Sequence, residues 1–295
     1  MANNSALKVV FGAMTFGKPD TLGARVSDPA QAAEILDVFL QHGHREVDTA
    51  RIYGAGSCEG ILAAADWAKR ALRTEKIDMF YLHGPDRKTP FEDTLREVNK
   101  LHQEGYFTHF GVSNYMSWEV AQICEICRKN GWIMPSVYQG IYHAPQRSIE
   151  AELFPCLRKY GISLYAFQPL AGGFLTGRYK RDQTDFEAGS RFDPNIMQES
   201  LHRKRYWNDA YFDAIEKIQS AAKNHELTLG EVALRWLKHH SQLRQELGDA
   251  IIVGASSVNH IRNNLDDLEK GPLPDNIVQT VEEAWPFVKG SAPKY

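Results

Sequence analysis

Polar side chains that could do chemistry stand at the ends of short apolar runs in this sequence. They are Asp48, His83, Ser113 with Asn114, Gln139, Gln168, and Ser256 with Ser257. An imidazole can polarise a carbonyl oxygen, and a carboxylate can help to hold a cation beside a proton donor. Because catalytic groups drawn from the ends of several strands are typical of (β/α) barrels, the pattern predicts one shared site at one end of such a barrel.

Seven apolar runs are the predicted strands that would position these groups. They span residues 7–14, 45–50, 78–84, 109–114, 136–142, 163–169 and 250–256. Most are apolar almost throughout, as are strands that are buried on both faces of a parallel sheet. Helical periods fill the gaps, so we predict an α/β fold. No G-x-G-x-x-G follows the first run, which argues against a doubly wound dinucleotide-binding sheet.

Helix signals punctuate the segments between the runs. Asp28 and Pro29 predict a helix start that Gly43 ends, and capping boxes are predicted at residues 89–92 and 228–231. Further helices are expected from Ser117 to Gly131, from Ser148 to Gly161 and from Asp275 onward. Residues 171–206 form a long insertion, and insertions of this length in compact domains are usually functional.

The spacing of the strand ends predicts a barrel that is one unit short. From Asp48 to Gln168, successive ends lie 25–35 residues apart, which fits one βα unit each. Only seven strands can be counted, whereas a closed barrel of this type has eight. We therefore predict a TIM-type (β/α) barrel that lacks one βα unit and occupies residues 1–295 as a single domain.

Composition excludes several other classes of protein. The 295 residues are 43% hydrophobic and 24% charged, and the net charge of −3 gives no reason to expect nucleic acid or an anionic membrane as partner. No secretory leader or membrane-spanning run is visible, so a cytoplasmic protein is expected. Cys124 and Cys127 form a C-x-x-C without the other ligands of a zinc site, and we interpret them as small residues on a helix. No metal is expected.

Six motifs in order along the chain resemble the aldo-keto reductase family. They are DTARIYG, FYLHGPD, FGVSNY, YQGIYH, FQPLAGGFLTGRY and IVGASSVNHIRNN. The likeness covers almost the whole chain and is strongest to the aflatoxin-aldehyde reductases and their fungal relatives. In that family a hydride passes from NADPH to a carbonyl, and a tyrosine donates the proton.

The resemblance implies a role for each site residue. It places Tyr53 at the proton donor, Asp48 beside it and His83 on the carbonyl oxygen. The implied NADP(H)-binding residues are Asp48, Ser113, Asn114, Gln139, Phe167, Gln168, Pro169, Leu170, Ala171, Gly172, Gly173, Arg178, Ser256, Ser257, His260 and Asn264. The implied partner is a small carbonyl substrate. Phe167 would stack on the nicotinamide, since stacking needs the ring and not a hydroxyl.

One element of the family pattern is missing from the sequence. A phenol of pKa near 10 is a weak acid unless a cation lowers that pKa, and the family uses a lysine at the end of its third strand. The segment from Asp48 to Asp78 is too short for an additional strand and helix. Lys69 and Lys76 are the nearest lysines, and both are expected on a helix or its exit. We predict that the lysine-bearing unit is deleted near Ala68.

Two functions remain open from the sequence. The first is NADPH-dependent reduction of an aldehyde or ketone in a fungal secondary-metabolite pathway such as terpenoid biosynthesis, with activity impaired by the missing lysine. The alternative is a catalytically inactive remnant that binds NADPH or a partner. The basic cluster from Arg203 to Arg205 is expected to be a solvated face.

Overall fold

One parallel sheet forms the centre of the protein, for which a computed structural model describes residues 7–21, 23–65, 77–195 and 198–292. Its strands are β1 (Lys8–Gly12), β2 (Glu46–Asp48), β3 (Ile77–Leu82), β4 (Phe107–Ser113), β5 (Pro135–Ile141), β6 (Ser163–Phe167) and β7 (Ala250–Val253). Each overlaps one of the seven apolar runs. The predicted α/β fold is therefore confirmed, with strand ends shifted by a few residues.

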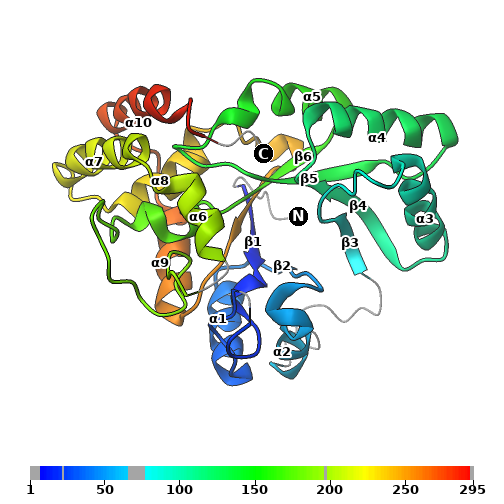
Figure 1. Cartoon of the computed structure of the whole chain (residues 1–295), viewed down its shortest axis with the longest axis horizontal. Helices are drawn as coiled ribbons and strands as arrows, with labels where there is room; N and C mark the ends of the chain where they lie inside the picture. Colours follow the sequence, from blue (N-terminus) through cyan, green and yellow to red (C-terminus); the bar gives the residue numbers. More distant parts are fainter. Residues whose placement is uncertain (1–6, 22, 66–76, 196–197, 293–295) are drawn as a thin grey trace.

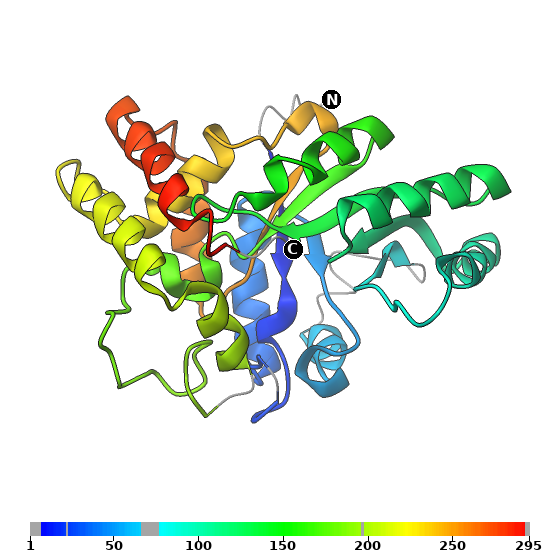
Figure 2. The same cartoon turned by 45° about the horizontal axis from the view of Figure 1, so that its top comes forward.

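The sheet is curled but not closed within the described residues. The strand order is β2-β1-β7-β6-β5-β4-β3, and every neighbouring pair is parallel. Strands β2 and β3 are the two edges. Figure 1 shows the sheet bent around its own axis with helices outside it, and Figure 2 shows the same half-barrel tilted. For the described residues, the observed architecture is thus the seven-stranded, incomplete barrel that the sequence predicts.

Helices cover the outer side of this half-barrel. They are α1 (Pro29–Gln41), α2 (Cys58–Ala64), α3 (Phe91–Gln103), α4 (Ser117–Asn130), α5 (Leu153–Tyr160), α6 (Gln198–Tyr206), α7 (Asp209–Lys223), α8 (Leu229–His239), α9 (Val258–Glu269) and α10 (Asp275–Val288). The carboxylate of Asp28 accepts from Ala30 N at 2.9 Å, and the hydroxyl of Thr228 accepts from Glu231 N at 3.0 Å. Both predicted N-caps are confirmed, because these side chains satisfy amides that the first helical turn leaves unpaired.

The predicted capping box at residues 89–92 is wrong. Helix α3 begins at Phe91 after Pro90, and its N-cap makes no side-chain hydrogen bond. The Thr89 hydroxyl instead donates to the Asp86 carboxylate at 2.8 Å. The Thr89 side chain therefore bonds to the loop before the helix, since Ser and Thr hydroxyls readily form local hydrogen bonds outside helices.

Strand alternation gives the sheet two different apolar faces. Val10, Val137, Tyr165, Ala250 and Ile252 pack together with Met79, Tyr81 and Phe167 on the concave face. The intervening residues, such as Val9 and Phe11 of β1, pack into the larger core beneath the helices. Since successive side chains point to opposite faces, the parity of a residue in its strand decides whether it reaches the interior of the half-barrel.

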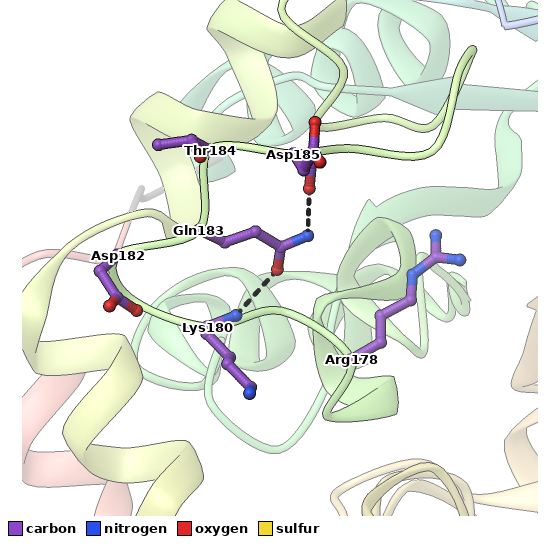
Figure 3. Close-up of a pocket in the computed structure, with 6 residues that line it drawn as sticks. All are labelled: Arg178, Lys180, Asp182, Gln183, Thr184 and Asp185. Carbon is purple, nitrogen blue, oxygen red and sulfur yellow. Dashed lines mark hydrogen bonds between the residues drawn. The ribbon is translucent and has the colours of Figure 1, made fainter.

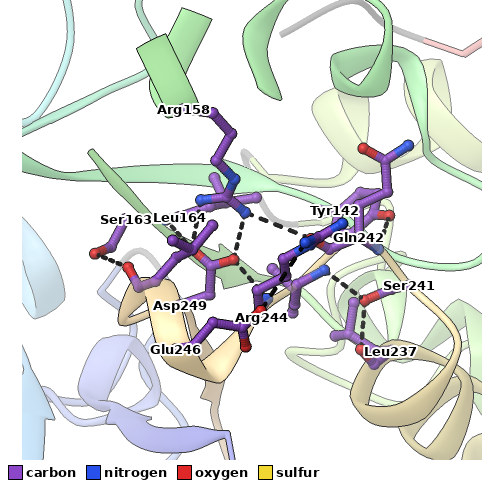
Figure 4. A network of polar contacts seen from close by, with 12 residues as sticks. Tyr142, Arg158, Ser163, Leu164, Leu237, Ser241, Gln242, Arg244, Glu246 and Asp249 are labelled. Carbon is purple, nitrogen blue, oxygen red and sulfur yellow. Dashed lines mark hydrogen bonds and ion pairs between the residues drawn. The ribbon is translucent and has the colours of Figure 1, made fainter. Parts of the chain in front are cut away.

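A polar network closes the amino-terminal end of β6 and β7. Asp249, which is 1% exposed, accepts hydrogen bonds from Arg158 Nη1 at 3.0 Å, from Leu164 N at 2.7 Å and from Arg244 N at 2.7 Å. Figure 4 shows these contacts converging on the Asp249 carboxylate. Four donors compensate the burial of the charge, counting both Arg158 nitrogens. This end of the sheet is opposite the strand ends that carry the candidate site.

The long insertion after β6 is built largely of aromatic packing. It begins with a short 3-10 segment, η5 (Ala171–Thr176), and ends with α6. The Arg203 guanidinium lies 4.6 Å from the Phe186 ring centre and 4.5 Å from that of Trp207. The prediction of a solvated basic face is therefore wrong for Arg203, because planar guanidinium groups stack well on aromatic rings.

None of the four cysteines forms a disulfide bond in this fold. Cys124 and Cys127 are buried in α4 and are free thiols, as are Cys58 and Cys156. Burial raises the pKa of the Cys124 thiol to about 12 and that of Cys127 to about 11. The interpretation of the C-x-x-C as helix packing is supported, because a raised pKa disfavours the reactive thiolate. Among the described residues, no helix is both long and apolar enough to cross a membrane.

Candidate active site

Several predicted site residues lie at strand ends with their side chains on the concave face of the sheet, at one end of the half-barrel. Asp48 ends β2 and Gln139 lies near the end of β5, both in phase with concave-face residues. Gln139 Nε2 donates to Asp48 Oδ1 at 2.7 Å. These strands are separated by three others in the sheet, so the contact exists only because the sheet is strongly curled. Two predicted site residues are thereby brought together.

Asp48 has the most perturbed carboxyl of this site. Its pKa is raised to about 6, chiefly by burial; the hydrogen bond from Gln139 opposes this increase, and the nearby Glu46 carboxylate adds a smaller one. A buried carboxyl disfavours its ionised form unless donors compensate. Asp48 is thus a group whose charge depends on pH in the range where an enzyme works, which is typical of functional carboxyls.

Tyr53 opens a short 3-10 segment, η2 (Tyr53–Gly56), which follows β2 after the loop of residues 49–52. This segment is held against the amino-terminal loop by glycine contact, since a Cβ on Gly54 would lie 2.6 Å from Gly17 Cα. Gly54 also has φ 56°, a conformation that side chains disfavour. The Tyr53 ring meets the His83 ring edge-on, with centroids 6.0 Å apart and planes at 83°. The predicted donor and the predicted carbonyl-orienting residue therefore face each other.

Tyr53 is half-buried and His83 is exposed, but partial desolvation shifts the pKa values of both side chains toward the neutral forms. Burial, and next the negative charge of Asp48, raises the pKa of the Tyr53 phenol above its ordinary value. Burial lowers the pKa of the His83 imidazole. A neutral phenol and a neutral imidazole can both donate a hydrogen bond to a carbonyl oxygen.

Asn114 connects His83 to the end of β4. Its Nδ2 donates to the His83 carbonyl at 2.8 Å and to Ser113 Oγ at 3.0 Å. Asn114 has φ 63°, in the left-handed region that residues other than glycine seldom adopt. Strained conformations of this kind cluster at functional sites, because the surrounding structure must hold them in place. Ser113, Asn114 and His83 thus form one connected group.

The segment after β6 forms a second part of the site. Phe167 belongs to the concave apolar cluster, and Gln168 has φ 58° and accepts from the Tyr206 hydroxyl at 2.9 Å. Pro169 and Ala171 are buried, and Leu170 is half-buried.

Gly172 and Gly173 follow with φ 67° and 97°. A Cβ at Gly172 would lie 2.7 Å from the His202 ring, and one at Gly173 would lie 3.2 Å from Arg178 Nη2. Both glycines adopt left-handed conformations in a turn that packs tightly against His202 and Arg178, so a side chain at either position is disfavoured.

Arg178 follows this turn and lies at the mouth of the long insertion. It lines a surface pocket together with Lys180, Asp182, Gln183, Thr184 and Asp185. Figure 3 shows that the Arg178 side chain extends away from the turn built around Gln183. Its Nη1 donates to Glu187 at 2.8 Å, and Arg25 also pairs with that carboxylate. The exposed Glu187 carboxylate therefore pairs with two arginines.

Helix α9 supplies the last predicted group. The Ser257 hydroxyl accepts from His260 N at 3.2 Å, and Ser256 Oγ lies 3.2 Å from His260 Nδ1. Burial, with smaller contributions from Arg178 and Arg25, lowers the pKa of His260. The amino terminus of α9 therefore lies within electrostatic reach of Arg178, and free helix amides beside cations suit an anion. Asn264 lies one turn further along and is half-buried.

One cation near Tyr53 was not expected from the sequence. Arg191, in the long insertion, acts electrostatically on Tyr53, and Tyr53 acts on it in return. Its side chain lies against Met14, with both terminal nitrogens 3.6 Å from Sδ. A single arginine in an irregular segment carries no sequence pattern, so only the tertiary structure could have identified it. Lys69 and Lys76, and the deletion point near Ala68, lie outside the described residues.

Comparison with known proteins identifies the family to which this chain belongs. The profile of the "Aldo/keto reductase family" matches residues 8–70 and 59–286. The chain belongs to the aldo/keto reductase family. It is 47% identical to "Aldo-keto reductase MYCFIDRAFT_156381" of Pseudocercospora fijiensis, over 88% of this chain and 99% of that protein. It is also 39% identical to human "Aldo-keto reductase family 7 member A3", over 97% of this chain and 96% of that protein.

A further fungal relative and a solved structure extend the comparison. "Aldo-keto reductase pigE" of Monascus ruber is 44% identical, over 97% of this chain and 96% of that protein. That alignment spans 329 positions, more than the 295 residues of this chain, so pigE contains residues without a counterpart here. The glycerol dehydrogenase AKR11B4 of Gluconobacter oxydans has the same fold, with TM-score 0.66 and 22% identity over 94% of this chain and 90% of that chain. As an aldo/keto reductase, the chain is an oxidoreductase of carbonyl compounds.

Proposed function

We propose that this aldo/keto reductase uses NADPH to reduce the carbonyl of an aldehyde or ketone, as one domain spanning residues 1–295. The observation that carries the proposal is the contact between the Tyr53 and His83 rings at the strand ends, with Asp48 beside them. In this reading the Tyr53 hydroxyl donates the proton, and His83 donates a hydrogen bond that polarises the carbonyl oxygen.

The residues of the second group fit a phosphate-bearing dinucleotide. Gly172 and Gly173 form a tight turn against Arg178, and Arg178 and the α9 amino terminus provide positive potential beside this turn. We propose that residues 168–178 hold the pyrophosphate and residues 256–264 the adenosine phosphate. Ser113, Asn114 and Gln139 would hold the carboxamide, with Phe167 against the ring. The bound cofactor supplies the hydride.

A fungal secondary-metabolite substrate, such as a terpenoid carbonyl, is the substrate class we propose. The support is the fungal relatives at 47% and 44% identity, and the similarity over the whole chain to "Oxidoreductase sirO" of Leptosphaeria maculans at 32%. The fold alone does not identify a substrate class, because proteins of one fold act on many different substrates.

Two measurements test the proposal in sequence. NADPH is first titrated while its fluorescence and that of the protein tryptophans are recorded, which establishes cofactor binding. Turnover of a reactive test aldehyde is then compared between the wild type and Tyr53→Phe. Loss of the proton donor should lower kcat by about 100-fold or more. Equal rates in the two proteins would rule the proposed function out.

An inactive, NADPH-binding remnant is the competing function. The observation that favours it is the raised pKa of the Tyr53 phenol, which makes it a weaker acid at neutral pH. Saturable NADPH binding without aldehyde turnover would select this alternative, whereas turnover that depends on Tyr53 excludes it.

A further inference from the structure

The environment of Tyr53 contains two influences that oppose proton donation. Burial and the Asp48 carboxylate both disfavour the phenolate, and the Cys58 thiol adds a smaller effect in the same direction. His83 lies on the ring edge and is itself favoured in its neutral form. A proton donor needs the opposite, a neighbouring cation that stabilises the phenolate left after transfer.

Arg191 occupies the position from which such a cation can act. Its guanidinium nitrogens lie 3.6 Å from Met14 Sδ in η1 (Ala13–Thr15), the segment that packs against η2, where Tyr53 lies. On the other side, Arg191 Cδ is 3.1 Å from where a Cβ at Gly172 would be. The arginine is thus held between the turn after β6 and the loop beside Tyr53.

The surroundings of Arg191 also shift the pKa of its own guanidinium. Burial lowers the pKa of its guanidinium and Arg25 adds repulsion, while Tyr53, Tyr206 and Tyr179 favour the charged form. A guanidinium remains protonated under all working conditions, so a positive charge persists at this position. Among the described residues, Arg191 is the cation that stabilises the Tyr53 phenolate.

We propose that the Arg191 guanidinium supports proton donation by Tyr53, and that the long insertion thereby supplies the cation which other family members carry on a strand. The proposal rests on the proposed function, because it concerns the same proton transfer. Arg191 acts through Tyr53, so it is a positioning residue and not a catalytic one.

A double-mutant cycle tests this coupling. Arg191→Met removes the charge but keeps much of the side-chain volume, and Arg191→Lys restores a cation. At saturating NADPH, Arg191→Met should lower kcat for the test aldehyde about tenfold, because a neighbouring charge shifts a pKa by about one unit or more. The KM for the aldehyde should change little, and Arg191→Lys should recover most of the rate. In the Tyr53→Phe background, Arg191→Met should have no further effect.

Arg181→Met is the matched control for this cycle. Arg181 belongs to the same insertion, but it pairs with Asp209 and Asp213 on α7 at the surface. Its loss should leave kcat within about twofold of the wild type, since exposed ion pairs contribute little.

A measurement independent of turnover completes the test. The Tyr53 Cζ resonance, identified by its loss in Tyr53→Phe, is followed by ¹³C NMR through an alkaline titration of the cofactor-free protein. It should begin to move at lower pH in the wild type than in Arg191→Met.

The outcomes separate the two proposals. Identical titrations, or an effect of Arg191→Met on kcat that persists without the Tyr53 hydroxyl, would overturn the role of Arg191. A change confined to NADPH affinity would do the same and would assign the arginine to cofactor binding. A wild type without turnover refutes the proposed function, and the NMR titration then decides on Arg191 separately.

Discussion

Gln139 Nε2 and Asp48 Oδ1 are joined by a hydrogen bond of 2.7 Å across the hollow side of the half-barrel. The bond links β5 to the edge strand β2, although β1, β7 and β6 lie between them in the sheet. It fixes the carboxyl that lies next to Tyr53 and partly offsets the burial of its charge. The curvature of the sheet and the electrostatics of the site are therefore coupled through this pair.

The raised pKa of Asp48 predicts that the protein loses stability as pH rises. The folded-state pKa of about 6 lies above the ordinary value of 3.8, so folding favours the protonated carboxyl. This contribution is fully present below about pH 4 and is lost as pH rises through 6. Asp48→Asn keeps an acceptor for Gln139 and removes the titration.

Urea denaturation between pH 4 and pH 8 checks this expectation. The free energy of unfolding of Asp48→Asn should exceed that of the wild type by about 3 kcal/mol at pH 8, with the difference shrinking toward pH 4. A difference that is constant across this range would show that Asp48 does not titrate with a raised pKa.

Removing the His83 hydrogen-bond donor should impair catalysis more than folding. His83→Phe keeps an aromatic ring against Tyr53 but leaves no N–H for the carbonyl oxygen. We expect kcat/KM for the test aldehyde to fall about 100-fold, as it does when one oxyanion donor is lost elsewhere. Steady-state kinetics measure this, and a thermal melt within a few degrees of the wild type serves as the folding control. Unchanged kcat/KM would remove His83 from the proposed chemistry.

Cofactor affinity should depend on Arg178. Arg178→Met removes the cation beside the glycine turn and the α9 amino terminus. The Kd for NADPH should rise about tenfold or more, because a charge-assisted hydrogen bond to a phosphate contributes about 1.5–3 kcal/mol. Fluorescence titration provides the measurement, with Lys217→Met as control because Lys217 pairs with Glu283 at the surface. Equal weakening by both variants would indicate a nonspecific charge effect.

Gly111 in β4 should be intolerant of a side chain. A Cβ there would lie 2.4 Å from Tyr81 Cε1, so the Tyr81 ring, which packs on the concave face, would have to move. We expect Gly111→Ala to lower the free energy of unfolding by about 1–3 kcal/mol, the usual cost of overpacking. Gly60→Ala in α2 is the matched control, since none of the described residues has an atom within 4 Å of its Cβ position. That variant should stabilise by about 0.5–1 kcal/mol, because alanine is the better helix former. Urea denaturation of both variants decides, and equal stabilities would contradict the packing argument.

The strands and most helix ends could be predicted from local patterns. Runs of Val, Ile, Phe and Tyr identified all seven described strands, and Asp28 and Thr228 cap helices as expected. These features depend on neighbours in sequence, which the sequence displays directly. Thr89 departed from its pattern because a competing acceptor, Asp86, lies only three residues away.

The sequence predicted which residues form the site, but not how their side chains contact one another. Family motifs pointed to Asp48, Tyr53 and His83, and their order along the chain matched that of the strands. Their contacts depend on how far the sheet curls, and the curl arises from the summed packing of all strands and helices.

The sequence by itself determined the alternation of strands and helices, the family and the residue types at the strand ends, because each of these is encoded in short segments. The tertiary structure alone decided that Gln139 reaches Asp48, that Arg203 is packed on aromatic rings and that Arg191 lies near Tyr53. These contacts join residues far apart in the chain. No local pattern specifies them, because burial and long-range charge depend on where the whole chain places each side chain.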